Sequence, residues 1–174
     1  LRTKINQQLA FEGYEINENG KFSNKKKANV ISDVELKVEN IKQELTERKA
    51  HAQIFKYCTP ELLTNNYFHA VFEAQKGLFQ RIRDLSGLTS DGTSLIEQAF
   101  SRNPILIINK FQTNQEMDEH TGFCNILKGL CGMFRNPGAH QPKIYWNIDE
   151  QDALEILGLI SYCHRRLDNV QRIR

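Results

Sequence analysis

One arginine and one histidine, five positions apart, form the pair in this sequence best suited to chemistry. They open and close the stretch RNPGAH, which runs from Arg135 through Asn136 to His140. An arginine guanidinium can hold two phosphate oxygens at once, and a histidine can take up and return a proton near neutral pH. With Asn136 as a neutral hydrogen-bonding partner, these groups could cleave RNA through its own 2′-hydroxyl without a metal ion.

The sequence around this pair can bring the two side chains to one spot. An amphipathic helix is expected over residues 118–134. It must end near Arg135, because a proline disfavours helical conformation in the residue before it and has no N–H group to donate. His140 then follows a Pro-Gly turn. The spacing alone is a weak signal, and a structural role is the alternative: Arg135 would bond helix carbonyls and His140 would fix the turn.

Three further cations are candidates for binding the substrate. Lys143 lies just after the motif, and Arg165 and Arg166 lie near the end of the last expected helix. The alternative for the two arginines is that they only offset the negative end of the helix dipole.

Metal binding is not expected. His120, Cys124 and Cys131 fall on one helical face, and His164 could join them, but the two cysteines alternate with large apolar residues as core cysteines do. The chain has no glycine-rich phosphate loop and no GxSxG motif. We therefore expect neither a metal nor another cofactor.

Size and composition favour one globular domain with an arm. The chain has 174 residues, of which 40% are hydrophobic and 25% charged. Its longest apolar run is the four residues Ile105–Ile108, which excludes a membrane-spanning helix. The net charge of +2 does not suggest a protein that coats nucleic acid, although a local basic site can still exist. The four cysteines form no CxxC pair, and no apolar leader precedes them, so we expect reduced thiols and a cytoplasmic protein.

Helical periodicity dominates the pattern, and the expected fold class is an all-α bundle of four main helices plus a short one. A turn signal at Glu18–Gly20 indicates a hairpin or irregular arm near the start. A capping box at Ser32–Glu35 opens a long amphipathic helix that ends before Cys58, and Pro60 opens the next. The remaining helices are expected over 93–100, 118–134 and from about Asp149 to Val170. Residues 1–56 are thus an N-terminal arm with a long helix, and 57–174 a helical domain.

Several segments in the right order resemble a known family. The stretch GFCNILKGLCGMFRNPGAH, together with NNYFHAVFEA, LTSDGTSLIEQAF and EQDALEILGLISYCHRRLD, resembles the bacterial Ymh-type family, a branch of the HEPN superfamily. The resemblance covers about residues 57–170. HEPN proteins carry Arg-x4–6-His on an all-α bundle, and Arg135, Asn136 and His140 match that motif without departure.

The resemblance implies a function as well as a fold. Active HEPN proteins are metal-independent endoribonucleases of toxin–antitoxin, abortive-infection and other antiviral systems, and they usually work as dimers whose motifs share one cleft. The expectation is therefore an RNA-cleaving homodimer, with an antitoxin or regulatory partner as a further possibility. Some HEPN domains are instead inactive modules that bind RNA or a partner protein. A target or regulator of nucleotide transfer is a third alternative.

Overall fold

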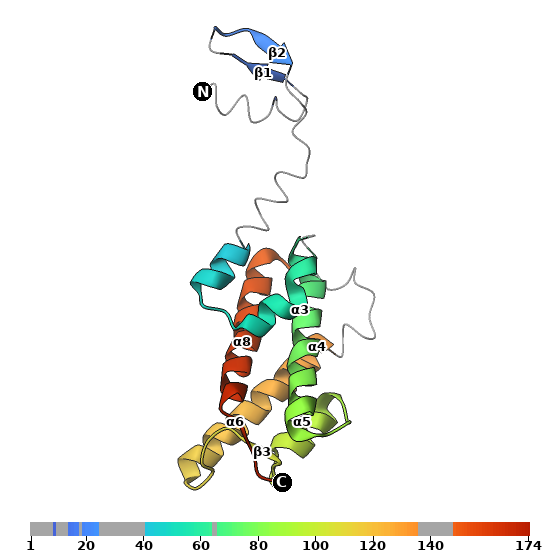
Figure 1. The fold of residues 1–174 in the computed structure, drawn as a ribbon, viewed down its shortest axis with the longest axis vertical. Coiled ribbons are helices and arrows are strands. Elements are labelled where there is room, and N and C mark those ends of the chain that lie inside the picture. The colour runs from blue at the N-terminus through green and yellow to red at the C-terminus, as the bar shows by residue number, and fades with distance from the viewer. Residues whose placement is uncertain (1–8, 10–13, 18, 25–40, 64–65, 136–147) are drawn as a thin grey trace.

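The computed structural model describes residues 9, 14–17, 19–24, 41–63, 66–135 and 148–174, and it is mostly helical (Figure 1). This confirms the expected all-α fold class. The main helices are α3 (Ala52–Leu63), α4 (Tyr67–Ser86), α6 (Asn114–Leu130) and α8 (Glu150–Asp168), with the shorter α5 (Gly92–Phe100) between α4 and α6. None of the described helices is both long and apolar enough to cross a membrane.

A small hairpin lies near the start of the chain. Strands β1 (Tyr14–Ile16) and β2 (Phe22–Asn24) pair antiparallel, with Tyr14 opposite Asn24. Gly20 has φ 72° in the turn, a conformation that glycine adopts at little cost. The turn expected at Glu18–Gly20 is therefore a hairpin.

The first helices divide differently from the prediction. A helix whose described residues are 41–47 ends before Lys49, which adopts φ 54°, so the expected continuous helix through Ala52 is wrong. Pro60 lies inside α3 instead of opening a helix. The following break comes at Asn66, whose side chain accepts a hydrogen bond from the N–H of His69 at 3.3 Å and caps α4. The predicted capping box at Ser32–Glu35 lies outside the described residues.

The later helix starts follow their capping residues closely. Asp91 caps α5, which begins one residue before the predicted range 93–100, and Asp149 caps α8 by accepting from the N–H of Asp152 at 2.8 Å. Helix α6 begins four residues earlier than predicted, because Thr113 and Glu116 form a capping box.

The core lies between α3, α4 and α8, which pack on one another, and α5 and α6, of which α6 runs obliquely to the others in Figure 1. The predicted inner stripes are confirmed: Phe123, Leu127 and Leu130 of α6 are at most 3% exposed. Gly77 of α4 lies directly under the ring of Tyr57 from α3. The sequence also offers this apolar stripe, together with Tyr145 and Trp146, as a dimer surface. Phe123, Leu127 and Leu130 are buried within one chain and cannot form it, and Tyr145 and Trp146 lie outside the described residues.

The apolar run at 105–108, which precedes α6, contains a short strand. Strand β3 (Leu106–Ile107) pairs antiparallel with β4 (Gln171–Arg172), which follows α8. The N–H of Ile173 extends this ladder by donating to the carbonyl of Ile105 at 2.9 Å.

Candidate functional site

The predicted motif begins at Arg135, the last described residue before the undescribed segment 136–147. Arg135 is the last residue of a π-helical turn, η1 (Cys131–Arg135), which continues α6. Asn136, His140 and Lys143 lie outside the described residues, as does the side chain of Arg135. The expected grouping of Arg135 with His140 therefore stays a prediction.

The change from α-helix to π-helix has a local cause in the sequence and in the packing. Gly129 and Gly132 flank the transition, and glycine is a poor α-helix former. From α4, the buried Gln75 side chain donates to the carbonyl of Leu130 at 2.6 Å, at the residue where α6 ends. Its own Oε1 has no partner in the described part of the chain. Since π-turns are rare and frequently mark functional sites, this one singles out the segment that leads into the motif.

Both ends of the segment 136–147 are anchored in the bundle. Phe134 precedes it with 7% of its surface exposed, and Ile148 follows it with 6%. Asp149 then caps α8. The last buried residue described before the segment is therefore Phe134, and the first one after it is Ile148, next to the start of α8.

The two arginines predicted to bind substrate lie at the far end of α8. Arg165 donates to the Ser161 hydroxyl at 2.9 Å, and Arg166 forms an ion pair with Glu119 of α6 at 2.5 Å. Arg166 lies 16 residues after Glu150, or about 24 Å along the helix. Within one chain, α8 thus holds these arginines far from Ile148, the first described residue after the motif segment.

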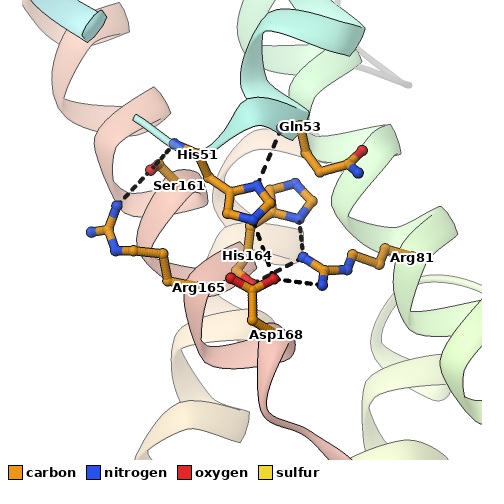
Figure 2. A network of polar contacts seen from close by, with 7 residues as sticks. All are labelled: His51, Gln53, Arg81, Ser161, His164, Arg165 and Asp168. Carbon is orange, nitrogen blue, oxygen red and sulfur yellow. Dashed lines mark hydrogen bonds and ion pairs between the residues drawn. The ribbon is translucent and has the colours of Figure 1, made fainter. Parts of the chain in front are cut away.

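A polar cluster that the sequence did not reveal ties three elements together (Figure 2). His51, just before α3, stacks on His164 of α8 with ring centroids 5.2 Å apart. Its Nε2 lies 3.2 Å from Asp168, which also accepts from Arg81 of α4 at 2.7 Å. Arg81 donates as well to the backbone carbonyl of His164 at 3.0 Å, and the Ser161 hydroxyl accepts from the backbone N–H of His51 at 2.8 Å. His164, which the sequence suggested as a possible metal ligand, is fully buried.

The electrostatics of this cluster favour a neutral His164 and a charged Asp168. Burial, together with the neighbouring His51 and Arg81, lowers the pKa of His164 to about 3, against the opposing effect of the Asp168 carboxylate. Burial acts to raise the pKa of Asp168, but the hydrogen bond from Arg81 and the proximity of His51 outweigh it, and the net pKa is lowered.

The geometry makes this cluster a structural clamp. Nδ1 of His51 accepts from the N–H of Gln53 at 3.2 Å, so its Nε2 carries the proton toward Asp168. Both ring nitrogens are therefore occupied, and His51 has no free position for taking a proton from a substrate. The clamp fixes the start of α3 against α4 and α8.

A second buried histidine lies beside a cavity of about 150 Å³. Nε2 of His120 lies 2.7 Å from the carbonyl of Phe100, to which it can donate. Burial lowers the pKa of His120, against the opposing effect of this hydrogen bond. Cys124 also lines the cavity, and burial raises the pKa of its thiol. In the described ranges no three His, Cys, Asp or Glu side chains are grouped to hold a metal ion, and the zinc alternative gains no support.

Fold and site together define an all-α protein with a π-turn leading into its candidate motif and a polar clamp across its helices. The chain belongs to a family described as proteins of unknown function (Hypoth_ymh), whose sequence model matches residues 48–167. The matched range runs from just before His51 almost to the end of α8, and it includes the whole motif. Comparison with curated proteins and with solved structures gave no match.

Proposed function

We propose that this protein is a metal-independent endoribonuclease of the HEPN superfamily, with Arg135, Asn136 and His140 at its active site. The observation that carries the proposal is the π-turn that ends at Arg135, immediately before the motif. π-Helical turns occur frequently at functional sites, and the residue types that come after this turn are suited to phosphate chemistry. The burial of Phe134 and Ile148 supports a motif segment whose two ends are attached to the bundle.

The proposed reaction is a transesterification within the RNA. His140 accepts the proton of the 2′-hydroxyl, whose oxygen forms a bond to the adjacent phosphorus. The bond from phosphorus to the 5′-oxygen breaks, and that oxygen takes up a proton. The products are a 2′,3′-cyclic phosphate and a 5′-hydroxyl. Arg135 stabilises the charge that grows on the phosphate oxygens, and Asn136 supplies a neutral hydrogen bond.

A homodimer would complete this site, and α8 offers a surface for it. Leu159 and Tyr162 are each 40% exposed on this helix, and an added Cβ on Gly158 would meet open space. Antiparallel pairing of two α8 helices about Leu159 would place Asp152 opposite Arg166 of the partner subunit, because each lies seven residues from the centre. The acidic start of α8 would thus meet a basic end, in an isologous interface.

This arrangement would also give the distant arginines a role. Arg165 and Arg166 of one copy would lie beside the start of α8 in the other copy, where the motif segment rejoins the bundle. Each site would then combine a motif from one chain with arginines from its partner. We further propose a bacterial defence role of the toxin or abortive-infection type, in the cytoplasm, with an antitoxin or regulatory partner.

The test is cleavage of a 5′-labelled RNA by the purified chain in EDTA. We expect fragments that end in a 2′,3′-cyclic phosphate, and none from His140→Ala. Lys42→Ala, which removes an exposed cation on the helix over 41–47, is the control and should cut at the wild-type rate. Melting curves verify that all three proteins fold. If the wild type binds RNA but does not cut it, the nuclease proposal fails and the alternative of a non-catalytic binding module replaces it.

A further inference from the structure

The cavity beside His120 has the composition of a binding site for an anion. Arg102, at the end of α5, and Lys128 of α6 bring two positive charges to its lining, which includes no Asp or Glu. Arg102 forms no ion pair within the part of the chain that the structure describes, and Lys128 lies 3.1 Å from Glu97 outside the lining. Thr121 and Asn125, both exposed on α6, add polar side chains with no described hydrogen bond.

A buried histidine lines the same cavity, and one of its ring nitrogens lacks a hydrogen-bond partner in the ranges that the structure describes. His120 is 1% exposed and can donate from Nε2 to Phe100, but its Nδ1 has no partner among the described residues. A buried acceptor without a donor is unfavourable, so a molecule in the cavity that offers an N–H or O–H would remove this penalty. His120 is thus a second, independent indication of a ligand.

One wall of the cavity is aromatic. The ring of Phe111 meets His120 edge to face, with centroids 5.0 Å apart. Phe111 adopts φ 55°, a left-handed conformation that costs free energy for a residue with a side chain. A flat ring with hydrogen-bond donors fits against Phe111 and His120, while an attached phosphate fits the cations of the rim. A nucleotide unit has both parts.

The cavity is lined partly by α6, which continues through η1 to Arg135 of the candidate active site. Lys128 precedes Arg135 by seven residues of α6 and η1, which is about 10 Å at 1.5 Å per residue. Roughly three nucleotides of a stacked strand span that distance, at about 3.4 Å per nucleotide.

We propose that this cavity is a subsite that holds one nucleotide of the RNA strand a few positions from the cleaved phosphate. Arg102 and Lys128 bind its phosphate, and the base lies against Phe111 with a donor toward Nδ1 of His120. The inference rests on the proposed function, since RNA is taken as the ligand.

The experiment measures binding of a labelled single-stranded RNA by fluorescence anisotropy, in the His140→Ala background so that nothing is cut. Adding Arg102→Ala should weaken binding about threefold to tenfold. It should also reduce the slope of log K against log salt by about 0.7, the value for one lost phosphate contact on a single strand. Lys42→Ala, which removes a cation elsewhere, should leave both quantities unchanged.

A second measurement reports on His120 directly. Ring nitrogen signals of His120 should shift when a nucleoside monophosphate is added, and less with inorganic phosphate. Unchanged affinity and salt slope in Arg102→Ala, or a cavity that holds only water with His120 unmoved, would overturn the subsite.

The two proposals can fail separately. If RNA binding depends on Arg102 but the wild type never cuts RNA, the nuclease function fails and the subsite stands. If cleavage depends on His140 but binding ignores Arg102, the reverse holds.

Discussion

Helices α3 and α4 approach each other closely at Gly77. Whether replacing this glycine by alanine stabilises or destabilises the protein depends on one neighbouring residue, Tyr57. A Cβ added at Gly77 would lie 2.3 Å from Cδ2 and 2.6 Å from Cγ of Tyr57, closer than carbon atoms can approach. Cγ is the root of the ring, so the ring cannot escape by a small rotation. Such overpacking costs about 1–3 kcal/mol, whereas Gly to Ala in a helix interior gains about 1 kcal/mol.

We therefore expect Gly77→Ala to lower the free energy of unfolding by about 1 kcal/mol, and Tm by roughly 2–4 °C for a chain of this size. In a Tyr57→Ala background the obstacle is gone, and the same substitution should raise stability by about 1 kcal/mol.

Urea unfolding of the four proteins of this double-mutant cycle measures the effect. Gly122→Ala on α6 is the matched control, because an added Cβ there meets nothing within 4 Å, and it should stabilise in either background. Stabilisation by Gly77→Ala in the presence of Tyr57 would refute the packing argument.

Three further predictions concern the motif, the clamp and the α8 surface. Arg135→Lys should slow RNA cleavage about tenfold to a thousandfold while RNA affinity and Tm change little, because lysine keeps the charge but loses the planar fork; full cleavage would remove Arg135 from the mechanism. The lowered pKa of His164 means that the unfolded chain binds one more proton between about pH 6.5 and pH 3, so stability should fall as pH drops through this range. His164→Gln should flatten the plot of the free energy of unfolding, measured with urea, against pH by up to about 1.4 kcal/mol per pH unit, and an unchanged profile would contradict a neutral His164. Leu159→Arg should turn a species of about twice 20.2 kDa into a monomer in light scattering, with no loss of Tm at low concentration; a wild type that is monomeric at micromolar concentration would rule out the α8 pairing.

Local signals in the sequence were sufficient for the fold class and for the starts of α5 and α8, whereas α6 begins four residues before its predicted start and the starts of α3 and α4 were not predicted. Asp91 and Asp149 cap the helices that follow them, because a carboxylate can bond free N–H groups wherever the chain folds. The inward stripes of α6 and α8 followed from the spacing of their apolar residues in the same way.

The first helices were mispredicted because tertiary structure overrides local preference there. Lys49 takes a left-handed conformation that a lysine rarely adopts, and no residue type announced it. Pro60 favours a first turn but lies in the third turn of α3. The periodicity of an amphipathic pattern can continue across such a break, so it does not show where the chain reverses.

Contacts between residues that are far apart in the sequence could not be predicted from it. His51 and Asp168 are separated by 117 positions, and nothing in their spacing indicates that they meet. The π-turn was also missed, since its residues read as an ordinary helix end. For the candidate site, residue types could be chosen from the sequence, while the cavity beside His120 required the packing of α5 against α6.

The pairing of β3 with β4 closes a large ring in the chain. Residues 106 and 172 meet at the base of this ring, and α6, η1, the motif segment and α8 all lie along it. The closure is made by the main chain, including the bond from the N–H of Ile173 to the carbonyl of Ile105, and therefore does not depend on which side chains the ring carries. The entropy of closing a loop grows only with the logarithm of its length, so extra residues in a connection between the helices of this ring add little to the cost of closing it. Insertions inside α6 or α8 are a different case, because they would shift the buried side chains of these helices out of the core.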